Sequence, residues 1–170
     1  DDIFFPLDAL WGEPAINFIG INARVPLADW RDQATHLDRA WQSPENPAYL
    51  QSNIEGGEGY AWHYPTFDDR ERQNRVELLD HTHHEHWIMR PKDMTGWWQH
   101  RHHERIGGIR QKRATQWVPQ SKPIWLFNVG CAAVDKGAND PASTAPWFST
   151  GLRDDSIQYA YIQNILDYWN

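Results

Sequence analysis

The sequence has one cysteine, no long apolar run and no excess of positive charge, and each shortage excludes a class of protein. Cys131 alone cannot form an internal disulfide or a zinc site made only of cysteines. No stretch approaches the roughly 18–20 apolar residues that a membrane-spanning helix needs. The formal net charge of −7 argues against a binder of duplex nucleic acid, which needs a basic face.

Familiar catalytic and cofactor-binding motifs are missing too. There is no Gly-x-Ser-x-Gly string that would carry a nucleophilic serine. The glycine-rich stretch at 56–59 is not followed by Lys-Ser or Lys-Thr, so it does not have the pattern of a phosphate-binding loop. The sequence therefore predicts no cofactor.

The composition is otherwise that of a folded domain with many aromatic rings. Apolar residues make up 40% and charged residues 23% of the 170 residues, which favours one globular unit, a single domain over 1–170. Eleven Trp, six Tyr and six Phe are present. Such rings either fill a core or line a binding surface.

Hydrophobic patterning predicts strands that alternate with helices. We expect strands at 15–23, 86–91 and 123–130, the last apolar throughout and so buried on both faces. We expect helices at 29–41, 48–54, 68–79, 94–100 and 154–169, with Asp29 and Asp154 among the caps.

This order is typical of the α/β class, with parallel strands joined by crossover helices. A closed eight-stranded barrel needs about 200 residues or more, so three to four strand-helix units would make only part of a (β/α)8 barrel. The chain begins without Met and ends inside a helical pattern. We therefore expect a piece of a longer polypeptide or a trimmed mature chain.

Seven of the nine histidines lie between His81 and His103. Imidazole suits zinc, copper or nickel, and alternate positions on a strand could pair two ligands on one face. The spacing does not match His-Glu-x-x-His, however, and polar loops explain the cluster more simply. The metal-ligand candidates are His81, His83, His84 and His86.

Carboxylates matter because glycoside hydrolysis needs two of them about 5–10 Å apart. In an α/β barrel they lie at the carboxyl ends of strands. Asp93 follows the predicted strand at 86–91 and is the catalytic candidate, although an ion pair with Lys92 or a nearby arginine explains it better. The other two predicted strands end near Asn22 and Asn128, whose amides do not ionise.

Several aromatic side chains are candidates for stacking on sugar rings, with core packing as the equally favoured alternative. Together with the amide of Asn22, the candidate saccharide-binding residues are Tyr60, Trp62, Trp97 and Trp98, with Tyr64 close by in the sequence.

Five segments of the chain resemble the TIM-barrel-like domain of gene transfer agents. They are LWGEPAINFIGI at 10–21, PLADWRD at 26–32, IEGGEGY at 54–60, WVPQSKPIW at 117–125 and GCAAVDKGAN at 130–139. Gene transfer agents are phage-like particles of alphaproteobacteria, and the domain belongs to a very large baseplate or tail-hub protein, often described as a glycoside hydrolase. The resemblance covers nearly the whole chain.

The resemblance implies a longer domain, of which this chain looks like the C-terminal half, stopping before the last strand. It also implies a glutamate at the strand end where this chain has Asn128, and an aspartate where it has Asn22. The remaining catalytic carboxylate would lie on a strand preceding Asp1. Loss of one essential catalytic group removes several orders of magnitude of rate, so we expect no glycosidase activity from this chain alone.

Three functions remain open. The first is a degenerate glycoside hydrolase-like domain, a pseudoenzyme that acts as a scaffold or reads cell-wall saccharide in a phage-like tail or baseplate. The second is an active peptidoglycan hydrolase that uses Asp93, Glu55 or Glu58. The third is a domesticated structural subunit of an unrelated large complex. The expected partners are other protein chains or the rest of the barrel, and the expected location is a phage-like particle or other large assembly.

Overall fold

The computed structural model describes residues 2–170 and confirms a mixture of helices and strands. The α-helices are α1 (Asp8–Trp11), α2 (Pro47–Ser52), α3 (Phe67–Arg72), α4 (Met94–Gln99) and α5 (Asp155–Trp169), and the 3-10 helices are Leu37–Trp41, His86–Met89 and Gly137–Asn139. The strands are β1 (Ile19–Asn22), β2 (Trp62–His63), β3 (Val76–Glu77), β4 (Arg105–Ile106), β5 (Ile109–Arg110) and β6 (Ile124–Phe127).

The two strands predicted at 15–23 and 123–130 form the central element, a parallel pair. β1 pairs with β6 in a register that places Ile19 opposite Ile124 and Asn22 opposite Phe127. The carboxyl ends of both strands therefore meet at one end of the sheet. The other pairs, β2 with β3 and β4 with β5, are antiparallel and short. Within residues 2–170 the strands do not close into a barrel.

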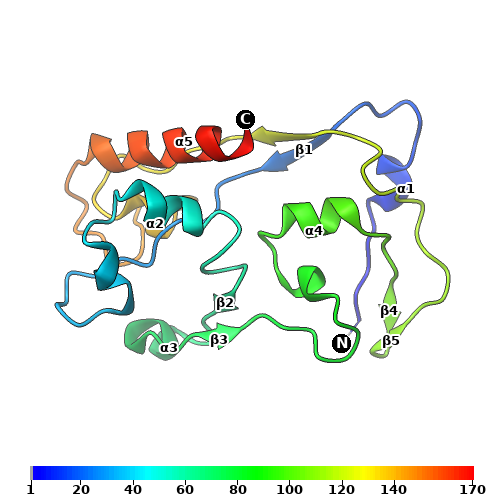
Figure 1. Cartoon of the computed structure of the whole chain (residues 1–170), viewed down its shortest axis with the longest axis horizontal. Helices are drawn as coiled ribbons and strands as arrows, with labels where there is room; N and C mark the ends of the chain where they lie inside the picture. The colour runs from blue at the N-terminus through cyan, green and yellow to red at the C-terminus, as the bar shows by residue number, and fades with distance from the viewer. Residues whose placement is uncertain (1) are drawn as a thin grey trace.

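Helix α5 lies alongside α2 (Figure 1) and packs against α2 and the 3-10 helix Gly137–Asn139, and Leu126 of β6 packs against the same core. The carboxylate of Asp154 accepts hydrogen bonds from the backbone N–H groups of Ser156 and Ile157, as predicted for its N-cap. Apolar residues occupy every fourth position of α5, and three of them, Ile157, Tyr161 and Ile165, are buried in the core with residues of α2. Trp169, the fourth, is 37% exposed.

The two faces of the parallel sheet differ. Leu126 packs on the core that contains α5, whereas the side chains of Trp125 and Phe127 are 52% and 48% exposed. The prediction that 123–130 is buried on both faces was therefore wrong. In a (β/α)8 barrel each helix packs outside the strand it follows. By that geometry the face of Leu126 is the outer face, and the face of Trp125 is the inner one.

The predicted strand at 86–91 was wrong, because His86–Met89 is a 3-10 helix. Just before it, the carboxylate of Asp80 accepts hydrogen bonds from the backbone N–H groups of Thr82, His83 and Glu85, which fold 80–85 into a turn. The backbone N–H groups of Ile88 and Arg90 then donate to the carbonyls of Glu85 and Trp87, which is the pattern of a 3-10 helix and not of a strand.

The predicted helix at 29–41 was also wrong. Within that range only Leu37–Trp41 is helical, as a 3-10 helix. The carboxylate of Asp29 accepts hydrogen bonds from the distant side chains of Tyr64 and Arg75 and does not cap a helix. The helix predicted at 68–79 begins after the cap Thr66 and ends at Arg72, because Gln73 adopts a left-handed backbone with φ of 54°. The chain then enters β3. The helices predicted at 48–54 and 94–100 are confirmed as α2 and α4.

No helix within residues 2–170 is both long and apolar enough to cross a membrane.

Candidate functional site

The carboxyl ends of β1 and β6 bring two amides together. Asn22 lies opposite Phe127, and Asn128 follows directly in a left-handed conformation with φ of 54°. Both asparagines are exposed. The sequence predicted that these positions share one end of a sheet, and the register confirms it. Neither side chain can donate a proton as an acid or attack as a carboxylate.

An exposed aromatic surface leads up to these amides on the inner face. The rings of Phe18 and Trp125 stack with centroids 4.1 Å apart, and Phe127 lies 6.3 Å from Phe18. Gly20 leaves room for this arrangement, since a Cβ there would meet the Phe127 ring at 2.4 Å. We name Phe18, Asn22, Trp125 and Phe127 the inner face. The sequence did not identify its three rings as candidate binding residues. A continuous apolar run does not show which of its side chains lie on which face of the sheet.

The aromatic candidates from the sequence are divided between separate environments. The guanidinium carbon of Arg90 lies 4.9 Å from the ring centroid of Tyr60, and that of Arg75 lies 4.1 Å from Trp62. Both arrangements are cation–π contacts, which stabilise the cation against the ring.

The two tryptophans of α4 lie elsewhere. Trp97 packs edge-on against Trp11, with ring centroids 5.1 Å apart, and in a tilted arrangement against Trp117 at 4.8 Å. The indole N–H of Trp98 donates to the Lys122 carbonyl at 2.7 Å. The structure therefore does not gather these four rings into one surface with Asn22.

Asp93 is the N-cap of α4. Its Oδ1 accepts from the backbone N–H of Gly96 at 2.7 Å, and its Oδ2 lies 3.9 Å from Arg90, which is the ion pair weighed from the sequence. Asp93 also lines an apolar cavity of about 350 Å³ with Trp97 and with Ile19 and Ile21 of β1. The strand on which its catalytic placement depended is absent, and the cavity lies beside β1 rather than at the strand ends.

The other two candidate carboxylates differ in their partners. Glu58 holds Arg70 through two hydrogen bonds of 2.5 and 2.8 Å. Glu55 accepts one hydrogen bond from the Tyr168 hydroxyl at 2.7 Å, and among the described residues it has no cationic partner. Burial and this bond raise the pKa of Tyr168 to about 12, so the phenol remains a donor to Glu55 at neutral pH.

Two of the four histidine candidates, His83 and His86, form hydrogen bonds with Asp80. Nδ1 of His86 accepts from the Asp80 backbone N–H at 2.9 Å, and the rings of His84 and His86 are 6.3 Å apart. His81 is exposed, and Nε2 of His83 faces the Gly108 carbonyl at 3.5 Å. Among residues 2–170, no three His, Cys, Asp or Glu side chains are placed to share a metal ion.

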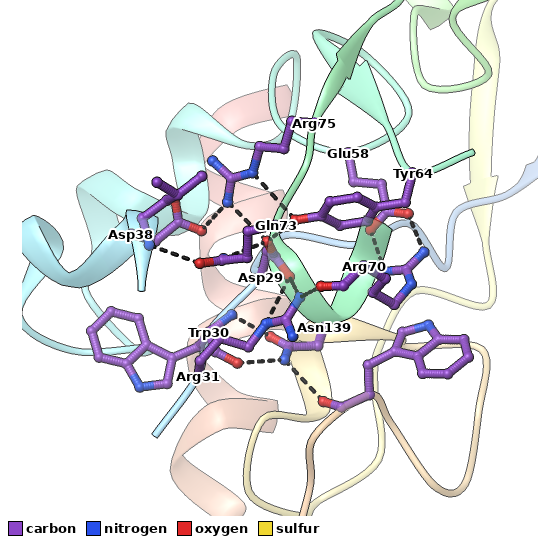
Figure 2. A network of polar contacts seen from close by, with 12 residues as sticks. Asp29, Trp30, Arg31, Asp38, Glu58, Tyr64, Arg70, Gln73, Arg75 and Asn139 are labelled. Carbon is purple, nitrogen blue, oxygen red and sulfur yellow. Dashed lines mark hydrogen bonds and ion pairs between the residues drawn. The ribbon is translucent and has the colours of Figure 1, made fainter. Parts of the chain in front are cut away.

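The largest polar cluster surrounds Asp29 (Figure 2). Its Oδ1 accepts from Arg31 at 2.9 and 3.2 Å, and its Oδ2 accepts from the Tyr64 hydroxyl, Gln73 and Arg75 at 2.6–2.9 Å. Arg75 also holds Asp38 at 2.7 Å. We name this set, with Glu58 and Arg70, the Asp29 network.

The charges of the Asp29 network balance, with three carboxylates and three arginines. Burial alone raises the pKa of Asp29, but the hydrogen bonds from Arg75, Tyr64 and Gln73 and the charge of Arg31 outweigh it and lower the pKa. Burial and the bond to Asp29 raise the pKa of Tyr64 to about 12. The network joins residues 29–38 to the segment 58–75, a long-range arrangement that the sequence did not reveal.

Acid should lower the free energy of unfolding of this protein below about pH 5. Burial raises the pKa of Asp29, Asp80 and Asp135, but hydrogen bonds to their arginine, lysine and backbone partners lower it more. Their ordinary value is 3.8, so this stability is complete above pH 5 and is lost as the pH falls through the lowered native pKa values. We expect the unfolding free energy from urea titrations to fall by about 2 kcal/mol or more between pH 5 and pH 3. An unchanged value would contradict these carboxylate assignments.

Comparison with known proteins agrees with the resemblance in the sequence. The model of the gene transfer agent TIM-barrel-like domain matches residues 1–170. The chain belongs to this family of TIM-barrel-like domains. No curated protein and no solved structure matches it. The family indicates a phage-like particle as the context of the protein.

Proposed function

We propose that this chain is a non-catalytic, glycoside hydrolase-like domain with a structural or saccharide-binding role in a phage-like tail or baseplate. The observation that carries the proposal is the pair of amides, Asn22 and Asn128, at the adjoining ends of β1 and β6. In TIM-barrel enzymes the catalytic side chains lie at this end of the strands. Glycoside hydrolysis requires two carboxyl groups there, and an amide replaces neither.

Three carboxylates elsewhere in the chain support the proposal because they already have partners. Asp29 accepts five hydrogen bonds, Glu58 holds Arg70 with both oxygens, and Asp93 caps α4. A general acid or a nucleophile must be free to exchange a proton or to reach a substrate.

The inner face suits both proposed roles at different depths. Phe18 and Trp125 lie before and within the strands, where side chains from other strands fill the interior of a complete barrel. Asn22 and Phe127 lie at the strand ends, where an aromatic face and an amide can contact a sugar ring. Scaffold packing would therefore use the first pair, and saccharide contact the second.

The test is a combined hydrolysis and binding assay with chitooligosaccharides and muropeptides. We expect no turnover, and binding that changes tryptophan fluorescence. Phe127→Ala should weaken that binding about three- to tenfold, the value of one aromatic stacking contact. Trp41→Ala removes another exposed ring, 37% exposed against 48% for Phe127, outside the inner face and should leave affinity unchanged. Robust turnover would overturn the proposal, and absence of binding would leave only the structural role.

A second function, peptidoglycan hydrolysis, is favoured by one observation. Glu55 is the one carboxylate among the three weighed from the sequence that has neither a cation partner nor a helix to cap in the described part of the chain. If the assay detects turnover, Glu55→Gln should abolish it, whereas Glu71→Gln, an exposed site on α3, should not. Turnover that survives Glu55→Gln would exclude this function for Glu55.

A further inference from the structure

A polar cavity of about 440 Å³ lies beside the Asp29 network and belongs to no site described above. It is formed entirely by residues of the segment 30–42, including Trp30, Arg31, His36 and Arg39. Its lining differs from that of the apolar cavity beside β1, because nitrogen donors dominate it.

Two arginines give the cavity its donors. Arg31 is 2% exposed and donates through Nε and Nη2 to Asp29 and to the Arg70 carbonyl, while Nη1 forms no hydrogen bond to the described residues. Arg39 donates through Nη1 to the Ala34 carbonyl and lies within 4 Å of no carboxylate in the part of the chain that the structure describes. Both guanidinium groups therefore keep unused N–H donors.

His36 forms another part of the cavity wall. The side chain is 8% exposed and packs edge-on against Trp30 with ring centroids 4.4 Å apart. Its Nδ1 is buried and has no hydrogen-bond partner among residues 2–170. Buried polar atoms are nearly always paired, so this nitrogen is an exception. Because Nδ1 itself has almost no accessible surface, His36 lines the cavity through the rest of its ring.

Most of the acidic groups near the cavity have cationic partners. Asp32, the carboxylate in the lining, forms an ion pair with Lys136 at 3.0 Å, although Lys136 also holds Asp135 and the Asp32 side chain is 71% exposed. Asp29 pairs with Arg31 and Arg75, and Asp38 pairs with Arg75. Arg39 therefore remains as the lining cation without an acidic partner within 4 Å among the described residues.

We propose that this cavity binds an oxyanion, the carboxylate or phosphate group of a small ligand, through Arg39 and Arg31. The planar fork of a guanidinium matches two oxygens of either group, and such charge-assisted bonds are among the strongest hydrogen bonds in proteins. The rings of His36 and Trp30 form the adjoining wall, which the rest of the ligand would contact. This site is separate from the strand ends, and it does not depend on whether the inner face binds saccharide.

The experiment titrates the protein with three probes: inorganic phosphate, D-glucuronate and uncharged D-glucose. Backbone NMR shifts localise binding, which should appear in residues 30–42 for the two anions and be absent for glucose. Arg39→Gln should weaken anion binding about tenfold or more, the loss expected for a charge-assisted contact. Arg113→Gln removes a cation from an exposed loop outside the cavity and serves as the matched control.

The relative affinities identify the source of the oxyanion. Tighter binding of glucuronate indicates an acidic sugar, and tighter binding of phosphate indicates a phosphorylated ligand. Because Arg39 is exposed and outside the Asp29 network, its variant should unfold at the same urea concentration as the parent. The proposal is overturned if neither anion shifts residues 30–42, if glucose binds equally well, or if Arg39→Gln and Arg113→Gln weaken binding to the same extent.

Discussion

Replacing Asp29 with Asn should lower the free energy of unfolding by about 3–5 kcal/mol. The carboxylate is buried and is the common acceptor for Arg31, Arg75, Tyr64 and Gln73. An amide of the same shape removes the charge and places an N–H group among donors. Arg31 would then be a buried cation without a counter-ion, and burying an uncompensated charge is the main part of the cost.

Urea denaturation followed by tryptophan fluorescence measures this loss. Asp155→Asn is the matched control, because it removes the same charge from an ion pair with Arg153 that lies in solvent. Solvent-exposed pairs contribute little, so the control should leave the midpoint nearly unchanged. If Asp29→Asn costs less than about 1 kcal/mol, the Asp29 network does not hold the two segments together.

Replacing Lys92 with Met should be comparably severe. Nζ of Lys92 donates to the backbone carbonyls of Pro26, Asn53 and Gly56. These bonds join the segment around Lys92 to residue 26 and to the turn at 53–56. Met fills most of the volume but leaves three buried acceptors without a donor. Each buried unsatisfied group costs about 1–3 kcal/mol, so we expect a loss of at least about 3 kcal/mol.

This measurement is best made at pH 6. Burial lowers the pKa of Lys92 to about 7, with the charge of Glu58 opposing the shift, so below that pH the side chain carries all three N–H donors. Lys112→Met, in an exposed loop, changes the same residue type without breaking such bonds and should not move the midpoint. Equal midpoints for the two variants would show that the three carbonyls find other donors.

The elements that were predicted correctly depend on neighbours along the chain. Helix α5 combines a cap at Asp154 with apolar residues every four positions, and both signals lie within the helix itself. β1 lies in a short run rich in Ile, and β6 is a continuous apolar run. By contrast, the segment 29–41 has helical spacing of apolar residues, yet Asp29 is engaged by the distant Tyr64 and Arg75. Tertiary hydrogen bonds therefore overrode the local pattern.

The family, the α/β class and the amides at Asn22 and Asn128 follow from residue identity and local order alone. Three features required the folded arrangement: Asp93 caps α4, Glu58 pairs with Arg70, and Trp125 lies on the inner face, opposite the packed side of the sheet. The physical reason is that a carboxylate binds whichever donor the fold brings within reach. That donor can lie dozens of residues away, as Arg75 does from Asp29.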